Sequence, residues 1–344
     1  MGLAGIFKSE YMRQPTSSIT AIAGYAPERV VCNREIENLV NGKEELIGSG
    51  SIERLFGVKE RRFAKCGEQV SDLAVQAASQ ILANMDPDSI DCLIFAAASS
   101  DLIEPATANI IQSKLGITCA AFDVKNACNS FVTGLHVANA FIVAGNFKKV
   151  LLVNGEILSH AIKFKLDNKE ELAKRLAAYS LGDAGAAALI EPARDESGIY
   201  SQKMISFGQY WNLCIIPGGG SMHPHDASKT YFEGKTSEML QVFIENKGRI
   251  AEKCLEEAGW SLGDIDHFFM HHVSKKTFEI VAGGLGITTS KFYNVIQDRG
   301  NIAAASIPYA MSEASRNKVL KKGDKVMLIG LASGISISIQ LLIW

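Results

Sequence analysis

The chain has 344 residues, of which 47% are hydrophobic and 21% are charged, and its formal net charge is −2. This composition is typical of a soluble globular enzyme, and the length is sufficient for two domain-sized cores. The near-neutral charge, without a block of lysine and arginine, gives no reason to expect a nucleic-acid partner. No apolar run approaches the roughly 18 residues that a membrane helix needs, so we expect no membrane span.

The cysteines indicate a reducing compartment. Seven of them occur without regular close spacing, at positions 32, 66, 92, 119, 128, 214 and 254. Free thiols explain this odd number better than a disulfide framework does. The first residues, MGLAGIFKSEYMRQ, become polar too soon for a secretory signal, and Ile6 does not fit a myristoylation motif. We therefore expect a cytoplasmic protein.

The first half of the chain alternates segments typical of helices and strands. In order, these are a helix over 74–85 (AVQAASQILANM), a strand over 90–95 (IDCLIF), a strand over 120–124 (AAFDV), a helix over 128–145 and a strand over 148–155 (KKVLLVNG). Continuous apolar strands that alternate with helices indicate sheets covered by helices on both faces.

The second half repeats the first. In order, its elements are a helix over 249–260 (RIAEKCLEEAGW), strands over 265–270 (IDHFFM) and 291–295 (KFYNV), a helix over 301–317 and a strand over 324–331 (DKVMLIGL). The tetrapeptide LGIT occurs in both halves, at 115–118 and 285–288. Matching positions lie between 170 residues (115 to 285) and 176 residues (148 to 324) apart, so chance similarity is a poor explanation.

The duplication suggests how the chain divides. We place the boundary after the strand AAALIEPAR, which gives an N-terminal half over 1–194 and a C-terminal half over 195–344. No low-complexity linker separates the halves, so we expect one rigid body with paired sheets and with helix layers between and outside them.

Reactive side chains fall where strands end and helices begin. Cys128 and Asn301 open the matching helices, and His271 and His272 directly follow the strand over 265–270. Sites in α/β proteins gather at such positions. Backbone N–H groups at a helix start are expected to lower the pKa of the Cys128 thiol and to stabilise an oxyanion.

Each of these residues also has a structural explanation. A cysteine in an apolar sequence is often inert core, Asn301 is a preferred helix cap, and the histidine pair can consist of one core and one solvent-facing residue. Neither an H-E-x-x-H motif nor paired cysteines accompany them, so we expect no metal.

Three motifs carry a resemblance to a known family. The segment DVKNACNSF around Cys128 resembles the nucleophile motif of β-ketoacyl-acyl-carrier-protein synthase III. FFMHHVSKKTFEIV resembles its histidine segment and aligns His271 with the catalytic histidine, and DRGNIAAASIPYAM resembles its asparagine motif, with Asn301 as the asparagine. The resemblance covers nearly the whole chain. It implies the α/β thiolase fold, five-layered αβαβα and built from two duplicated halves, in a homodimer.

The resemblance also implies a mechanism. Cys128 would be acylated by an acyl-CoA or an acyl-carrier-protein thioester, and His271 and Asn301 would hold the thioester carbonyl of a malonyl donor. Loss of CO₂ would then leave an enolate that attacks the acyl-cysteine. The oxyanion hole would consist of backbone N–H groups of Cys128 and Gly334. CoA and carrier-protein thioesters would be substrates, and no cofactor would be bound permanently.

The chain departs from the family pattern at three places. Ser51 and Leu55 stand where the family has a tryptophan and an arginine that enclose the CoA adenine, and Arg54, one residue out of register, is the candidate replacement. His272 replaces a usual glutamine. Glu104, followed by Pro105, replaces a bulky apolar residue that reaches the partner's acyl pocket across the dimer.

Glu104 leaves two interpretations open. A Glu-Pro pair is similar to that of thiolases that join two long acyl chains in olefin and alkylresorcinol pathways, where the glutamate acts as a base. Alternatively, the pair starts a helix, because an acidic residue before a proline suits a helix N-terminus.

The main hypothesis is therefore a synthase III-type acyltransferase. The first alternative is head-to-head condensation of two acyl or β-ketoacyl thioesters, with Glu104 as base. The second is acyl transfer to an oxygen or nitrogen acceptor, without a new carbon–carbon bond. The third is a non-catalytic partner subunit, against which the presence of Cys128, His271 and Asn301 argues.

Overall fold

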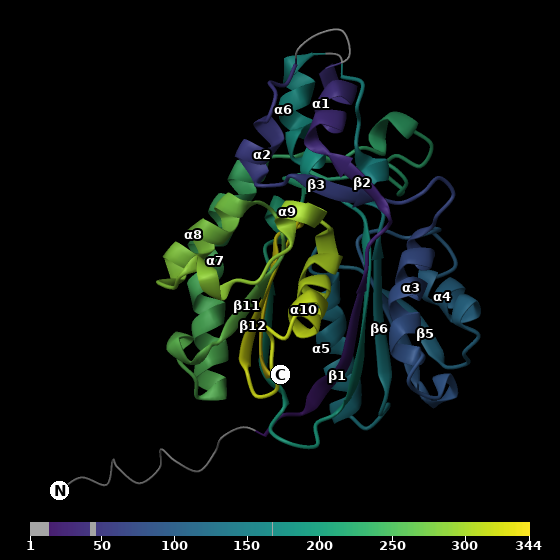
Figure 1. The fold of residues 1–344 in the computed structure, drawn as a ribbon, viewed down its shortest axis with the longest axis vertical. Helices are drawn as coiled ribbons and strands as arrows, with labels where there is room; N and C mark the ends of the chain where they lie inside the picture. Colours follow the sequence, from purple (N-terminus) through teal and green to yellow (C-terminus); the bar gives the residue numbers. More distant parts are fainter. Residues whose placement is uncertain (1–13, 42–45, 167) are drawn as a thin grey trace, which may run out of the picture.

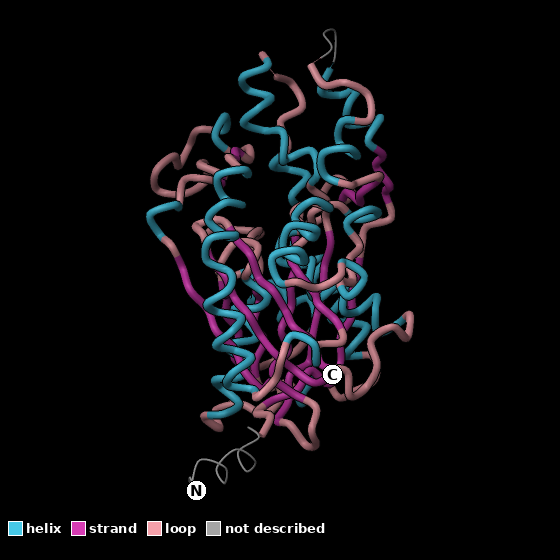
Figure 2. Tube along the Cα trace, turned by 90° about the vertical axis from the view of Figure 1, so that its left-hand side faces the viewer, coloured by secondary structure: helices cyan, strands magenta, loops and turns pink. Residues whose placement is uncertain are grey.

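The computed structural model describes residues 14–41, 46–166 and 168–344. The expectation about a signal or lipid-attachment motif concerns the first residues and lies outside these ranges. Figure 1 shows two sheets face to face, with helices between them and on both outer sides. Figure 2 looks onto these layers from one outer side, so that helices and strands overlap in the view. The layers follow the order helix, sheet, helix, sheet, helix, as the duplication predicts.

The first sheet belongs to the N-terminal half. Its strand order is β1 (Ser17–Tyr25), β7 (Ala184–Pro192), β6 (Val150–Glu156), β4 (Cys92–Ala96) and β5 (Ala120–Val124). Strand β4 pairs parallel with β5 and β6, whereas β7 pairs antiparallel with β6 and β1. The strands β5 and β6 lie at the positions that the sequence predicts, with shifts of at most two residues at their ends.

The second sheet belongs to the C-terminal half. Its strand order is β11 (His267–Met270), β12 (Lys325–Ala332), β13 (Ser336–Ile343) and β8 (Gly198–Ser206). The expected strand over 291–295 is wrong, because this segment forms only a single parallel bridge between Phe268 and Phe292. The second sheet therefore lacks the counterpart of the edge strand β5. The boundary at 194/195 falls in the connection between β7 of one sheet and β8 of the other.

Helices fill the remaining layers. Helices α3 (Val70–Leu82) and α4 (Thr107–Leu115) cover the first sheet, α5 (Ser130–Val143) and α10 (Ser306–Arg316) lie between the sheets, and α7 (Thr236–Ala258) and α8 (Lys275–Leu285) cover the second sheet (Figure 1). Helices α4 and α8 both end in a left-handed glycine, Gly116 (φ 68°) and Gly286 (φ 70°), within the repeated LGIT. This shared cap supports the duplication.

Alternate side chains along the strands explain the layers. In β4, Leu93 and Phe95 pack in the core beneath α3, whereas Ile94 packs in the core between the sheets. In β12, Leu328 faces the core between the sheets and Ile329 faces the core beneath α7. Because successive strand residues point to opposite faces, a strand buried on both sides must be apolar at every position.

Smaller elements gather above one end of the sheets (Figure 1). They are β2 (Arg29–Cys32), α1 (Asn33–Asn41), α2 (Ser51–Phe56), β3 (Glu60–Phe63), α6 (Lys169–Arg175), β9 (Cys214–Ile215), β10 (Glu233–Gly234) and α9 (Ile296–Arg299). Among the described residues, no helix is both long enough and apolar enough to cross a membrane.

Candidate active site

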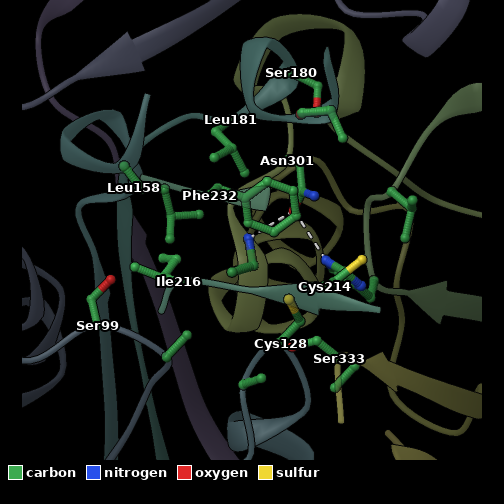
Figure 3. A pocket seen from close by; sticks show the side chains of 18 of the residues that line it. Ser99, Cys128, Leu158, Ser180, Leu181, Cys214, Ile216, Phe232, Asn301 and Ser333 are labelled. Carbon is green, nitrogen blue, oxygen red and sulfur yellow. Dashed lines mark hydrogen bonds between the residues drawn. The ribbon is translucent and has the colours of Figure 1, made fainter. Parts of the chain in front are cut away.

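A cavity of about 970 Å³ lies at the end of the sheets and receives residues from both halves. Cys128, His271 and Asn301 all line it. Figure 3 shows Cys128 and Asn301 on opposite sides of the same space, with Cys214 beside them. The structure thus brings together the three side chains that the motifs indicate.

The cysteine lies in a tight turn between β5 and α5. Ala127 has a positive φ of 46°, and the helix begins at Ser130, two residues later than the sequence predicts. The side chain of Asn129 donates to Ser336 Oγ at 3.1 Å and Ser338 Oγ at 2.7 Å, both in β13. The turn that carries Cys128 in one half is therefore fixed to a strand of the other.

A glycine makes this attachment possible. A Cβ atom at Gly330 would lie 1.8 Å from Oδ1 of Asn129, so any larger residue there would displace the amide. Gly330 belongs to β12, in the middle of the second sheet. Close approach between the turn and the sheet thus depends on the missing side chain.

The resting thiol does not have the lowered pKa that the helix-start argument predicts. Burial raises the pKa of Cys128, and the nearby carboxylate of Glu156 raises it further. Because the thiol is buried, desolvation raises its pKa by more than the backbone N–H groups lower it. Cys128 is therefore a thiol at ordinary pH, and it would have to lose its proton to act as a nucleophile.

His271 and Asn301 form a hydrogen-bonded pair. Oδ1 of Asn301 accepts the backbone N–H of Ala303 at 3.0 Å, which identifies this atom as the oxygen of the amide. Nε2 of His271 lies 3.0 Å from the same oxygen and must therefore carry a proton. The amide nitrogen of Asn301 remains as a second donor, so the pair offers two neutral N–H groups.

The histidine is neutral at ordinary pH. Burial lowers the pKa of His271 to about 4, although its hydrogen bond with Asn301 acts in the opposite direction. His272 does not line the cavity and is fully buried, with its ring 5.7 Å from that of Phe278. Both of its ring nitrogens lack a hydrogen-bond partner within the described part of the chain, and burial lowers its pKa to about 3.

Asn301 is held by the N-terminal half. Its backbone N–H donates to the carbonyl of Ser180 at 2.8 Å, and its carbonyl accepts the N–H of Gly182 at 3.0 Å. The segment that leads into β7 therefore fixes the asparagine, just as β13 fixes the cysteine turn. Each half positions a functional residue of the other.

A buried carboxylate completes the site. Glu156, at the end of β6, is fully buried and accepts hydrogen bonds from Ala98 N (2.8 Å), Ser99 N (3.0 Å) and Ser99 Oγ (2.7 Å). Ala98 and Ser99 both line the cavity. Glu156 is not among the residues that the motifs indicate. Its sequence signal is an acidic residue that ends the strand VLLVNGE, in which Asn154 is the other polar residue.

Comparisons with known proteins place the chain in one family. Residues 122–208 match the family model of 3-oxoacyl-[acyl-carrier-protein] synthase III, and residues 255–344 match its C-terminal model. A β-ketoacyl-[acyl-carrier-protein] synthase III from Desulfitobacterium hafniense is 32% identical over 334 residues, which cover 95% of this chain and 97% of the relative. The chain belongs to the 3-oxoacyl-[acyl-carrier-protein] synthase III family.

Solved structures agree with this family and confirm the thiolase fold. The synthase III from Aquifex aeolicus has a TM-score of 0.84 at 28% identity, covering 95% of this chain and 100% of that one. Cerulenin-bound OleA from Xanthomonas campestris has a TM-score of 0.87 at 27% identity, covering 96% of this chain and 97% of that one. The two likenesses are of comparable strength, and the chain is similar to both kinds of condensing enzyme.

Two other residues implied by the synthase III resemblance lie near the cavity. Gly334 has a φ of 74° in the turn between β12 and β13, beside Ser333, which lines the cavity (Figure 3). Arg54 is exposed on α2, next to the cavity-lining Leu55, and donates from Nη2 to Ser51 Oγ at 2.7 Å.

Glu104 is not among the residues that line the cavity of its own chain. It is exposed, and so are the neighbouring Leu102 (52% exposed) and Ile103 (90% exposed). Helix α4 begins at Thr107, so Glu104 precedes the helix without being its cap. No cluster of three or more metal-binding side chains occurs among the described residues.

Proposed function

We propose that the protein joins an acyl group carried on Cys128 to a malonyl thioester, giving a β-ketoacyl thioester and CO₂. The observation that carries this proposal is the shared cavity, in which a thiol faces a pair of neutral hydrogen-bond donors. A β-ketoacyl synthase of the synthase III type needs these two functions and no metal. Membership of the family supports the same Claisen condensation.

The first step is acylation. The thiol of Cys128 attacks the carbonyl of an acyl thioester, its proton passes to the departing thiol, and the acyl group stays on Sγ. Backbone N–H groups of Cys128 and Gly334 are the proposed donors to the oxyanion of this step. The positive φ at Gly334 suits a backbone N–H that must turn toward a ligand.

The second step makes the carbon–carbon bond. When the malonyl group binds, the Nε2–H of His271, which donates to Asn301 Oδ1 in the free protein, also donates to the thioester carbonyl oxygen. The Asn301 amide nitrogen donates to the same oxygen, so that the electrons left by CO₂ are held as an enolate. The enolate carbon attacks the acyl carbonyl, and the Cys128 thiolate leaves and regains a proton. A neutral histidine suits this role, because it donates a hydrogen bond without protonating the carbanion.

The remaining features of the proposal follow the family. We propose the two halves, 1–194 and 195–344, as the domains, and a cytoplasmic homodimer as the functional form. Acyl-CoA and acyl-carrier-protein thioesters are the proposed substrates, without a permanently bound cofactor. Arg54, beside the cavity wall at Leu55, is the proposed contact for a CoA nucleotide.

Head-to-head condensation of two acyl chains is the second candidate. The observation that favours it is Glu104. Its carboxylate is exposed on a loop that follows the cavity-lining Asp101, and the apolar side chains of Leu102 and Ile103 on the same loop are exposed too. In a dimer, such a loop can bring Glu104 to the partner's cavity, where it would remove a proton from the second acyl chain. The likeness to OleA supports this alternative.

Product analysis distinguishes these functions. The protein is incubated with acyl-CoA or acyl-carrier-protein thioesters, with and without a malonyl thioester, and the products are identified by mass spectrometry. A β-ketoacyl product that appears only with the malonyl donor supports the main proposal. A β-keto product formed from acyl thioesters alone supports head-to-head condensation, an ester or amide indicates transfer to another acceptor, and no turnover indicates a non-catalytic subunit.

A further inference from the structure

Much of the cavity wall is apolar, although Glu68, Asp101, Lys125 and Lys276 also line it. Apolar side chains come from several separate segments, and they include Leu158, Leu181, Ile216, Phe232, Leu240 and Phe243. Figure 3 shows Leu158, Leu181, Ile216 and Phe232 around the space above Cys128. Such a lining favours a hydrocarbon chain, since each buried methylene group contributes about 0.8 kcal/mol.

A second, much smaller void lies beneath α7. Its volume is about 20 Å³, and the lining residues that the structure describes are all apolar: Leu240, Phe243, Ile244, Ala251, Val281, Leu285, Met327, Ile329, Leu331, Ile337 and Ile339. The void lies between α7, α8 and the strands β12 and β13. A dry void of this kind stabilises nothing, because its lining atoms lack contact partners.

Two side chains separate the void from the main cavity. Leu240 and Phe243 line both spaces. They are three residues apart on α7, so they lie on the same face of the helix and form one partition. The outer wall of the void includes Ile244, which is 40% exposed, so this wall borders solvent and has room to yield.

We propose that the partition of Leu240 and Phe243 opens onto a subsite beneath α7 that binds the end of a long, straight acyl chain held on Cys128. This inference rests on the proposed acylation of Cys128 and adds the substrate class, a long aliphatic acyl group. A chain that reaches the partition displaces Phe243, and the void supplies part of the space for the terminal carbons. The free-energy cost of displacing Phe243 is offset by van der Waals contacts between the terminal carbons and the side chains that line the void.

The competing explanation is an ordinary packing defect. Protein interiors contain a few voids that have no function. A defect predicts that changes at the partition alter stability alone, whereas a subsite predicts that they alter the longest acyl chain accepted. The position of the partition, shared with the cavity that holds the nucleophile, favours the subsite.

The test measures acylation of the full-length protein with straight-chain acyl-CoAs of increasing length. The rate constant is followed by intact-protein mass. We expect it to rise up to about fourfold per added methylene while the chain is still being buried, to rise by less per methylene once Phe243 must be displaced, and to level off when the subsite is full. In Phe243→Leu and Phe243→Ala the rise should continue to longer chains, further in the alanine variant.

Two variants, Phe243→Leu and Phe232→Leu, serve as matched backgrounds that show whether the change in chain length depends on the void. Val281 lines the void but not the main cavity, and Phe232 lines the main cavity but not the void. Val281→Leu, which fills the void, should reverse part of the extension in the Phe243→Leu background. It should leave the profile of Phe232→Leu unchanged, because that variant does not open the partition.

The outcomes separate the inference from the function on which it rests. If both Phe243 variants unfold cooperatively, take up acetyl groups and keep the wild-type length limit, the subsite is disproved while the acylation of Cys128 stands. A reversal by Val281→Leu in both backgrounds also contradicts the subsite, because the effect would then be unspecific. If no acyl-CoA modifies the wild-type protein, the proposed function fails together with the inference.

Discussion

His271 Nε2 lies 3.0 Å from Oδ1 of Asn301, and the backbone N–H of Ala303 fixes that oxygen from the other side. This relationship determines which atoms can donate to a substrate. The imidazole carries its proton on Nε2, and the amide nitrogen of Asn301 is left for a ligand. The histidine comes from the end of β11 and the asparagine from the segment after α9, so the fold of the second half creates the pair.

The first prediction concerns this pair. His271→Ala and Asn301→Ala should each slow release of CO₂ from a malonyl thioester about a hundred- to a thousandfold, because each removes one donor to the enolate oxygen. Acylation of Cys128 should slow much less. The two rates are measured separately, by trapping CO₂ and by intact-protein mass. Equal loss in both steps would contradict a specific role in decarboxylation.

The second prediction concerns Glu156 and the thiol. Glu156→Gln should lower the pKa of Cys128, because it removes a carboxyl group whose negative charge opposes the thiolate at pH values above its own pKa, which burial raises. The rate of alkylation by iodoacetamide should therefore rise severalfold at a fixed pH below the pKa. Glu156→Asp, which retains the charge, is the control and should resemble the wild type. An unchanged alkylation profile in Glu156→Gln would show that this carboxylate does not influence Cys128.

The third prediction concerns acid stability. The folded-state pKa of His272, about 3, lies below its ordinary value of 6.5, so the unfolded state binds a proton that the folded state does not. The free energy of unfolding therefore keeps its full value above pH 6.5. It falls as the pH is lowered, by up to about 1.4 kcal/mol per pH unit for each such histidine. His271, with a pKa of about 4, acts in the same direction.

His272→Leu tests this account. The variant should unfold with a shallower loss of stability between about pH 6.5 and pH 4.5, because one of the two buried histidines is gone. At neutral pH it should also be more stable, since it removes ring nitrogens that lack partners, a burial that typically costs about 1–3 kcal/mol. Urea unfolding at several pH values measures both effects. A slope equal to that of the wild type would refute the assignment.

The fourth prediction concerns Glu104 across a dimer. If it acts at the partner's cavity, two inactive variants, Cys128→Ala and Glu104→Ala, should regain activity when they are unfolded and refolded together. One site of each mixed dimer then combines an intact Cys128 from one chain with an intact Glu104 from the other. Action within a single chain restores nothing. Full activity of Glu104→Ala alone would leave Glu104 as a loop residue without a catalytic role.

Most of the fold follows from the duplicated pattern. Strand β5 occupies the expected range, 120–124, because apolar runs between helices leave few alternatives. The segment over 291–295 has a strand-like composition but does not join the sheet as a strand. Its Phe292 stacks on Phe268 with ring centroids 5.2 Å apart, and the chain turns directly into α9 at Ile296. Aromatic packing therefore holds this segment in place of a ladder of strand hydrogen bonds. Amino-acid composition alone does not predict such packing.

The candidate site was predictable in its residues and less so in its electrostatics. Cys128 and His271 follow the strands β5 and β11, and Asn301 follows α9. The topology brings all three to one cavity. The raised pKa of Cys128 depends on burial and on Glu156, which follows a different strand. Neither the burial of Cys128 nor the proximity of Glu156 can be read from the local sequence around the cysteine. Spacing indicates Cys128 as the candidate nucleophile, but only the packed structure gives the protonation state of its thiol.

Mass analysis of the protein after incubation with an acyl thioester tests the central claim most directly. The account predicts one added acyl mass per chain, located on the peptide that contains Cys128 and absent from the Cys128→Ala variant. The Asn301→Ala variant should still acquire the acyl group, since its proposed role begins in the following step. Acylation that persists in Cys128→Ala, or that maps to Cys214 in the wild type, would contradict the account.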